Sequence, residues 1–208
     1  MAGVRHPRFA RAFERRAARA EAAGQAALRR ELLAGLDGAV VEVGAGTGLS
    51  FPHYPAAVRV LALEPEPYLR GRALAAAGAA SARVRVVAAV ADQIPARDGA
   101  FDAAVVSGVL CSVPDPGRAL AELRRVLRPG GELRFYEHVR AAGAFGRVQD
   151  AAAPLWSRLH GGCRPNRETL MALEGAGFRV RRWRGFQSPT DWRWSPVGPR
   201  ILGVALRA

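Results

Sequence analysis

Short apolar runs alternate with helical stretches through the first two thirds of the chain. These runs are bounded by Gly, Pro or Asp, which is typical of buried strands. The predicted strands are residues 39–43, 58–63, 84–90, 101–106 and 132–136. The first crossover helix is expected to begin within residues 47–55, and later helices at 66–79 and 116–127. This alternation predicts a doubly wound α/β fold with a mostly parallel, Rossmann-like sheet and right-handed crossovers.

The pattern changes after Arg140. Residues 141–163 are predicted to form a helical insertion above the carboxyl ends of the strands, where open α/β sheets bind their ligands. The elements expected after it are a helix at 166–176 and strands at 178–186 and 200–206, joined by a loop through Trp192 and Trp194. The sheet is therefore expected to have seven strands, the last of them antiparallel.

An arginine-rich helical pattern precedes the first strand. It starts at Pro7, an acceptable first helical residue, and Gly35 is its expected stop. Apolar positions such as Phe13 form one face, and arginines cover the rest. We interpret residues 1–37 as a helical cap, which packs on the main domain, residues 38–208, or covers its ligand as a lid. A peripheral membrane contact is a third option, and we do not expect it.

The turn after the first strand carries three alternating glycines, Gly44, Gly46 and Gly48. Glycine permits positive φ and lets a backbone approach a bulky ligand without a Cβ clash. The dinucleotide fingerprint G-x-G-x-x-G has a different spacing and holds a pyrophosphate at a helix N-terminus. The spacing here, with Glu42 inside the preceding strand, favours a nucleoside without phosphates. Glu64 ends the second strand about 20 residues later, where a carboxylate can accept hydrogen bonds from two ribose hydroxyls.

Charge and cysteine content limit the other possibilities. The 208 residues carry a formal charge of +13, but all 31 basic residues are arginines spread along the chain, as a bias in the coding genome would produce. No basic groove with interleaved aromatic residues is visible, so we expect no specific nucleic-acid partner. Cys111 and Cys163 fit a reducing cytoplasm, and their spacing favours neither a disulfide nor a metal site. No apolar run reaches the 18 or so residues of a membrane span.

Four motifs in a fixed order give a more specific signal. They are residues 41–48, 63–65, 98–102 and 123–131. This order resembles class I S-adenosylmethionine-dependent methyltransferases of the type 11 branch. Further motifs at 109–113, 136–139 and 162–163 are similar to the methyltransferase-like group that includes the alkyl thiol S-methyltransferases.

The resemblance implies an S-adenosylmethionine-dependent methyltransferase that acts on a small-molecule acceptor. It also implies that the glycines line the methionine and ribose of the cofactor and that Glu64 holds the ribose hydroxyls. Relatives usually carry an acid before Ala91, where this chain has Val90, so either Asp92 or the backbone at Ala91 is expected to contact the adenine. The expected cofactor-binding residues are Glu42, Gly44, Gly46, Gly48, Glu64, Pro65, Ala91, Asp92 and Ser107.

Methyl transfer from a sulfonium is an in-line displacement that needs an aligned nucleophile and a dry site more than a metal. A thiol acceptor, with a pKa of about 8.5, ionises with little help, whereas a hydroxyl needs a positioned base. The expected catalytic residues are His138 as base and Glu137 beside it, because both follow the fifth strand at the ligand edge. Adjacent strand residues point to opposite faces, so only one of the two is expected to enter the pocket.

The acceptor and the class of activity leave alternatives open. Thiol S-methylation is slightly favoured, and O- or N-methylation of a natural product, a quinone or a lipid stays open. The two cysteines are expected to be small core residues rather than catalytic thiols. A nonenzymatic module that binds the same cofactor and an NAD-dependent oxidoreductase are the alternatives to a methyltransferase. The sequence carries no signal for the oligomeric state.

Overall fold

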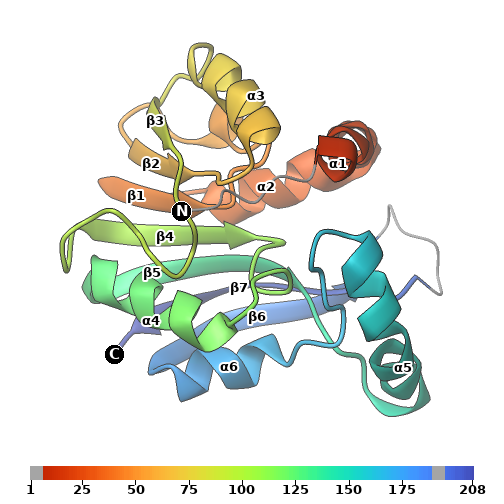
Figure 1. The fold of residues 1–208 in the computed structure, drawn as a ribbon. Coiled ribbons are helices and arrows are strands. Elements are labelled where there is room, and N and C mark those ends of the chain that lie inside the picture. Colours follow the sequence, from red (N-terminus) through yellow and green to blue (C-terminus); the bar gives the residue numbers. More distant parts are fainter. Residues whose placement is uncertain (1–6, 189–194) are drawn as a thin grey trace.

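In the described residues, 7–188 and 195–208 of the computed structural model, seven strands form one sheet between two layers of helices (Figure 1). The strands are β1 (Ala39–Val43), β2 (Arg59–Leu63), β3 (Arg83–Val87), β4 (Phe101–Ser107), β5 (Leu127–His138), β6 (Phe178–Gln187) and β7 (Pro199–Arg207). Their order is β3-β2-β1-β4-β5-β7-β6. The first five strands pair in parallel, and β7 runs antiparallel to both β5 and β6. The expected doubly wound, mostly parallel sheet with an antiparallel last strand is confirmed.

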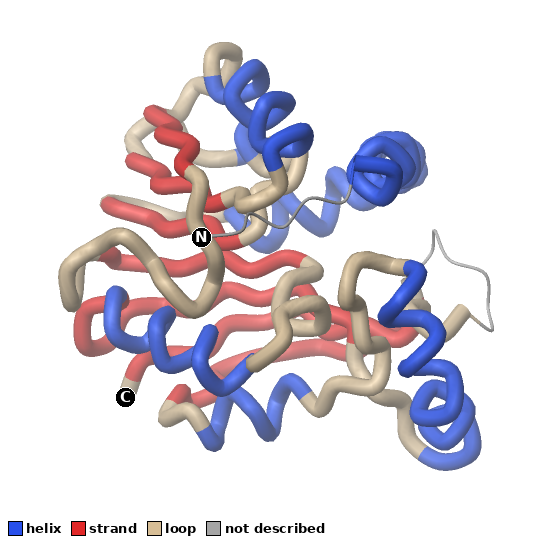
Figure 2. The backbone as a smooth tube through the Cα atoms, in the orientation of Figure 1, coloured by secondary structure: helices blue, strands red, loops and turns tan. Residues whose placement is uncertain are grey.

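Helices cover both faces of this sheet. The α-helices are α1 (Pro7–Ala20), α2 (Ala26–Leu33), α3 (Pro67–Ala77), α4 (Pro116–Val126), α5 (Gly143–Leu159) and α6 (Thr169–Gly175). Residues of α2 and α3 pack on one face, and residues of α4 and α6 pack on the other. Figure 2 shows that α5 lies beyond the carboxyl ends of the parallel strands, and α1 lies against α3 at the same end of the sheet.

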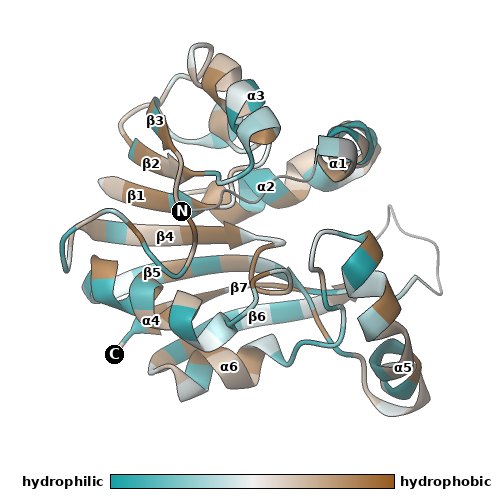
Figure 3. Cartoon of the chain, in the orientation of Figure 1, coloured by the Kyte–Doolittle hydropathy of each residue, from teal (hydrophilic) through white to brown (hydrophobic). Residues whose placement is uncertain are grey.

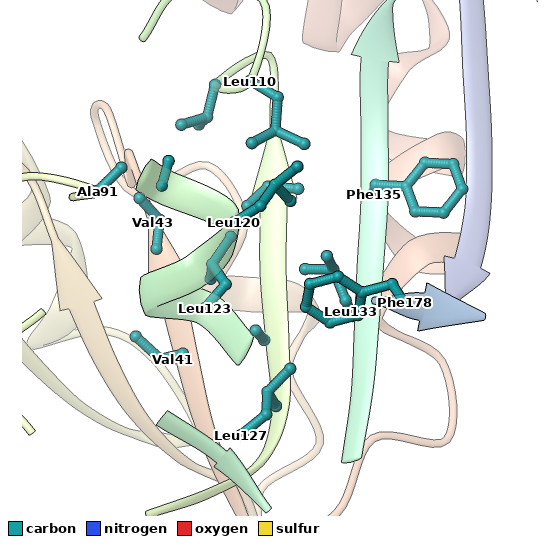
Figure 4. Packing of buried hydrophobic residues seen from close by; sticks show 14 of the residues in the cluster. Val41, Val43, Ala91, Leu110, Leu120, Leu123, Leu127, Leu133, Phe135 and Phe178 are labelled. Carbon is teal, nitrogen blue, oxygen red and sulfur yellow. The ribbon is translucent and has the colours of Figure 1, made fainter. Parts of the chain in front are cut away.

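Side-chain alternation along the central strands supplies both faces of the core. Val41 and Leu133 point toward α4, whereas Val40 and Ala103 point toward α2 and α3. Figure 4 shows Val41 and Leu133 on the side of α4, together with Leu120 of that helix. Figure 3 shows apolar colouring through β1 and the carboxyl half of β4. Parallel strands are buried on both faces, which is why their sequences read as continuous apolar runs.

The first crossover contains no α-helix, contrary to the expectation for residues 47–55. The chain forms turns and one short 3-10 helix, Phe51–His53, before β2. Tyr54 is already extended, with φ −72° and ψ 137°. Proline removes the amide donor that a longer helix needs, and it disfavours a helical conformation in the residue before it. Pro55 therefore ends this helix within one turn, whereas Pro52 lies in the first turn, where proline is tolerated.

The N-terminal pattern is divided at Gly24, although its sequence predicts one continuous helix. Gly24 has a φ of 115° within the π-helical segment Glu21–Gln25, which separates α1 from α2. A glycine tolerates this conformation, which other residues rarely adopt. α2 ends at Leu33, close to the predicted stop.

Residues 128–131, predicted as a turn before the fifth strand, form a bulge inside β5. Leu127 pairs with Phe101 and Glu132 pairs with Ala103, so the four residues between them face a single residue of β4. β3 also ends at Val87 and α6 begins at Thr169, each three residues inside the predicted limits. The predicted loop through Trp192 and Trp194 lies outside the described residues.

Arg134 of β5 fixes the end of α2 to the sheet. Its side chain is buried, and its Nη1 donates to Leu32 O at 3.0 Å and to Ala34 O at 2.6 Å. The last carbonyl groups of a helix have no partner within the helix, so a buried guanidinium satisfies them well. Glu132 accepts from the same guanidinium, with 2.8 Å between Arg134 Nη2 and its Oε2. This contact fixes α2 relative to β5 and thereby orients α1 at the carboxyl edge.

Arg134→Met should lower the free energy of unfolding by about 1–3 kcal/mol, because it leaves the buried carbonyl of Leu32 and the partly buried carbonyl of Ala34 without this donor. Arg128→Met is the matched control, since the side chain of Arg128 is 58% exposed and pairs with Asp102 at the surface. Loss of such a surface pair should cost about 0–1 kcal/mol. Urea unfolding of both variants measures the difference, and equal losses would contradict the role of Arg134.

Candidate active site

The glycine turn after β1 requires its three glycines. Gly44, Gly46 and Gly48 have φ values of 70°, 59° and 82°. A methyl group added to Gly44 would lie 2.6 Å from Val109 Cγ2, and one added to Gly48 would lie 2.7 Å from Phe51 Cε2. These distances are too short for a side chain. The turn therefore combines a left-handed backbone with close packing, as its sequence predicts.

Glu64 lies beside this turn, at the end of β2. Its Oε2 accepts from Gly46 N at 2.8 Å, and its Oε1 accepts from Glu66 N at 2.9 Å. Burial raises the pKa of Glu64, and the two backbone donors partly offset that effect. Arg70 donates to the carbonyl oxygens of Glu64 and Pro65 at 3.0 and 2.9 Å. The structure thus brings this carboxylate to the glycine turn.

Glu42 is buried within β1, on the face that α2 covers. Its Oε2 accepts from the hydroxyl of Tyr54 at 3.0 Å. Burial is the main cause of the raised pKa of Glu42, and the hydrogen bond from Tyr54 opposes it. The carboxylate therefore joins β1 to the segment that follows the glycine turn.

The loop after β3 approaches the same edge of the sheet. Ala91 is buried and Asp92 is exposed in this loop. The loop is fixed to α4 because Ile94 N donates to Glu122 Oε2 at 2.9 Å and Arg125 Nη2 donates to Ile94 O at 3.1 Å. The sequence did not indicate this anchor, because Glu122 and Arg125 belong to a helix that is remote from the loop in the chain.

Ser107 completes the group of residues at the carboxyl edge. It is the last residue of β4, is half-buried, and precedes Gly108, whose amide donates to Tyr136 O at 2.8 Å. Since β4 pairs with β1, Ser107 lies next to the end of the strand that carries the glycine turn. In doubly wound folds this is the place where the strand order reverses and ligands bind.

Glu137 holds the loop that follows β4. Its Oε1 accepts from Val109 N at 2.9 Å and Leu110 N at 3.0 Å, and its Oε2 accepts from Cys111 N at 3.2 Å. The side chain is fully buried, which raises its pKa, while the backbone donors lower it. Because three backbone amides donate to this carboxylate, its structural role is to hold the loop in position.

His138 lies between two cysteines that are remote in the sequence. Its Nδ1 lies 3.2 Å from Cys111 Sγ and 3.5 Å from Cys163 Sγ, and the two sulfur atoms are 3.8 Å apart. The hydrogen bond between the two thiols lowers the pKa of Cys163 and, together with burial, raises that of Cys111. Both cysteines are buried, and His138 is half-buried. Glu137 and His138 thus both contact the loop at 109–111, although they are neighbours on β5.

α1 crosses the carboxyl edge between the glycine turn and the end of α5. A methyl group added to Gly46 would lie 3.3 Å from Phe13 Cε1, and one added to Gly161 would lie 2.5 Å from Phe9 Cζ. The two phenylalanine rings contact each other, with 6.0 Å between their centroids. Glu14 anchors the helix to α3, because it accepts from the Tyr68 hydroxyl at 2.6 Å. The apolar side of α1 therefore faces this edge.

Gln149 fixes α5 and the segments around it. Its side chain is fully buried, and its Nε2 donates to Val139 O, Pro165 O and Pro196 O at 3.1, 3.1 and 2.8 Å. Its Oε1 accepts from Ala141 N at 2.6 Å. Gln149 was not among the predicted site residues, and a polar residue inside an alanine-rich helix is the signal that could have identified it.

Two clefts lie near these elements. The smaller, of about 350 Å³, borders the glycine turn at Thr47 and is lined by Glu14 and Arg72. The larger, of about 440 Å³, lies against α6 and β6, and its lining includes Thr169 and Trp183. None of the expected cofactor residues lines the larger cleft, so cleft size does not identify the cofactor edge.

The doubly wound sheet, the alternating glycines and the acid at the end of β2 define a class I S-adenosylmethionine-dependent methyltransferase. A family model described as a methyltransferase domain matches residues 41–135. The human thiol S-methyltransferase TMT1B is 38% identical over 175 residues, which cover 81% of this chain and 70% of that protein. Human TMT1A is 37% identical over 174 residues, with the same coverage. The chain belongs to the methyltransferase family that includes these two proteins.

A solved S-adenosylmethionine-dependent methyltransferase from Thermotoga maritima has the same fold. Its TM-score is 0.68 at 21% identity, over 96% of this chain and 98% of that one. The protein is therefore an enzyme whose cofactor is S-adenosylmethionine and whose acceptor is a small molecule. The comparisons support neither a nonenzymatic binding module nor an NAD-dependent oxidoreductase.

The described part of the chain contains no helix that is both long and apolar enough to cross a bilayer. A cytoplasmic location stays a prediction, as does the lack of a nucleic-acid partner and of a peripheral membrane contact.

The pKa of Glu42 predicts a stability difference that depends on pH. Because burial raises this pKa above its usual value of 4.5, the folded protein binds the proton more tightly than the unfolded chain. The contribution of Glu42 to the free energy of unfolding is therefore lost as the pH rises through the raised pKa. Glu42→Gln carries no charge and retains an acceptor for Tyr54, so its stability relative to the wild type should increase from acidic to neutral pH.

Urea unfolding at a series of pH values measures this difference. Glu174→Gln, on the exposed side of α6, is the control and should show little dependence on pH. A Glu42→Gln difference that stays constant with pH would contradict the prediction.

Proposed function

We propose that this enzyme transfers the methyl group of S-adenosylmethionine to the sulfur of a small-molecule thiol. The observation that carries the proposal is that the carboxylate of Glu137 is hydrogen-bonded to backbone amides. A hydroxyl acceptor needs a positioned base, and three backbone amides occupy the carboxylate of Glu137, which leaves Nε2 of His138 as the remaining candidate of the two expected residues. A thiol ionises near neutral pH, since its pKa is about 8.5, and needs no carboxylate base. The names of TMT1A and TMT1B support a thiol acceptor independently.

The reaction is a displacement at the cofactor's methyl carbon. The thiolate sulfur forms a bond to the methyl group while the bond from the methyl group to the sulfonium breaks, which leaves a thioether and S-adenosylhomocysteine. The acceptor proton leaves to solvent or to a base. Alignment of the two sulfur atoms is worth roughly 7–11 kcal/mol of the barrier. The enzyme therefore contributes mainly position and exclusion of water.

The cofactor is assigned to the edge formed by β1, β2 and β4. The glycines let the backbone approach the methionine and ribose, and Glu64 accepts from the ribose hydroxyls beside Gly46. Pro65 and Ser107 border these groups, and Glu42 joins β1 to Tyr54 in the segment after the turn. The adenine lies against the loop after β3, where the backbone at Ala91 or the exposed carboxylate of Asp92 contacts it.

The acceptor is assigned to the space between the loop at 109–111 and His138. Val109 of this loop packs against Gly44, which places the loop beside the cofactor's methionine end. His138 can serve as a base only through Nε2, because its Nδ1 faces two sulfur atoms. Glu137 acts as a positioning residue, since it holds the loop that separates cofactor from acceptor.

The described part of the helical cap, residues 7–37, and the insertion at 141–163 cover this site. Phe9 and Phe13 of α1 contact the two glycines that border it, so α1 acts as a lid that excludes water. α5 forms the outer wall, held by Gln149.

Glu64→Ala should weaken the binding of S-adenosylmethionine about 10- to 100-fold. The loss corresponds to hydrogen bonds to a charged group, worth about 1.5–3 kcal/mol. Isothermal titration calorimetry measures the affinity, and circular dichroism verifies that the variant is folded. Glu174→Ala, which removes an exposed carboxylate of α6, should bind the cofactor as the wild type does. An unchanged affinity of Glu64→Ala would remove Glu64 from the cofactor site.

A panel of thiols, phenols and amines tests the acceptor. Incubation with S-adenosylmethionine should yield thioethers one methyl group heavier than the thiols, as detected by mass spectrometry. The rate should rise with pH toward the thiol pKa, about 8.5, because the thiolate is the nucleophile. Methylation of phenols or amines without any thioether would refute the thiol assignment but not the methyltransferase activity.

A further inference from the structure

We propose that Cys111, His138 and Cys163 bind one zinc ion. They come from three parts of the chain: the loop after β4, the end of β5, and the segment after α5. Among the described residues, their ligand atoms form a group in which all separations are within 4.8 Å. Two thiols and an imidazole are the donors that zinc prefers. The spacing of the cysteines along the chain did not predict this site.

The separations of the three atoms match a tetrahedral zinc site. With Zn–S bonds of about 2.3 Å and a Zn–N bond of about 2.0–2.1 Å, tetrahedral angles place two sulfurs about 3.8 Å apart and a sulfur and a nitrogen about 3.5 Å apart. The two sulfurs are 3.8 Å apart, and His138 Nδ1 lies 3.5 Å from Cys163 Sγ and 3.2 Å from Cys111 Sγ. One ion can therefore contact all three atoms with little rearrangement.

A disulfide explains the arrangement less well. Its S–S bond is about 2.05 Å long, so the sulfurs would have to approach by well over an ångström. A disulfide also gives no role to the imidazole that lies against both sulfurs.

The backbone around the site is fixed by hydrogen bonds. Cys111 N donates to Glu137 Oε2 at 3.2 Å, and Cys111 O accepts from Arg164 N at 2.7 Å. Cys163 N donates to His160 O at 3.2 Å. The bond from Arg164 joins the segment after α5 to the loop after β4. Both cysteines are thus held in place by contacts that do not depend on a metal.

Three protein ligands leave one position of a tetrahedral zinc ion open, as in catalytic zinc sites. If the proposed thiol acceptor is correct, this position receives the acceptor sulfur. The acceptor S–H proton goes to solvent as the thiolate binds, because a bound cation deprotonates a coordinating thiol. The thiolate then takes the methyl group, and the neutral thioether leaves as a weaker ligand. His138 is then a zinc ligand rather than a base.

The full-length protein, stripped with a chelator, should bind one equivalent of zinc. Elemental analysis measures the stoichiometry, and cobalt substitution should give the absorption bands of thiolate-bound tetrahedral cobalt. Cys111→Ser, Cys163→Ser and His138→Ala should each lower the zinc affinity at least tenfold, the order of loss known for metal-site mutations. His160→Ala is the control, because His160 stacks on Trp156 and is not a ligand, so it should bind zinc as the wild type does.

Calorimetry with S-adenosylmethionine should show unchanged cofactor binding in the cysteine variants, which shows that they are folded. Failure of the wild type to bind a stoichiometric ion, equal binding by the cysteine variants, or thiol counting that finds a disulfide would each overturn the zinc site.

The proposed zinc site and the proposed thiol acceptor can be refuted independently of each other. Addition of a thiol acceptor should shift the cobalt spectrum of the wild type, without any need for turnover. Zinc binding with no thiol-induced shift would keep the metal site and refute its role in acceptor binding. Thioether production by protein that binds no zinc would refute the zinc site and leave the proposed function intact.

Discussion

The arrangement of this enzyme depends on one buried carboxylate, that of Glu137. It accepts three backbone N–H groups of the loop at 109–111 and so joins the end of β5 to the end of β4. The same loop contacts Gly44 through Val109 and His138 through Cys111. A carboxylate so deeply buried is costly unless its oxygens are paired, and backbone donors supply those pairs. The cofactor side and the acceptor side therefore share one anchored loop.

Three buried carboxylates support this edge in related ways. Glu42, Glu64 and Glu137 have raised pKa values because burial disfavours their charged forms, and each also accepts a hydrogen bond that opposes that rise. Glu64 and Glu137 bond to backbone amides of the turns after β1 and β4, whereas Glu42 bonds to a tyrosine. Glu64 and Glu137 thus hold the turns after β1 and β4, and Glu42 joins β1 to Tyr54. These hydrogen bonds hold the turns in fixed positions at the site, where the orientation of the two reactants contributes to the rate.

The covering elements are held by separate polar contacts at their ends. Arg134 fixes the end of α2, Glu14 fixes α1 to α3, and Gln149 fixes α5 to the surrounding loops. Phenylalanines of α1 lie over the glycines between these anchors. An apolar cover that is attached by polar contacts suits methyl transfer, because the reaction needs a site from which water is excluded. At the same edge the two cysteines are buried and His138 is half-buried.

Local sequence was sufficient to predict the sheet, the glycine turn and the position of Glu64. Buried strands need apolar runs and tight turns need glycine, and both requirements are met by neighbouring residues. Local sequence did not predict the first crossover, where Pro55 ends a short helix, or residues 128–131, which form a bulge in the pairing of β5 with β4. The occupation of Glu137 by backbone amides and the meeting of Cys111, His138 and Cys163 were decided only by tertiary structure. Residues 52 positions apart become neighbours only when the insertion folds back over the strand ends, and no local pattern encodes that distance.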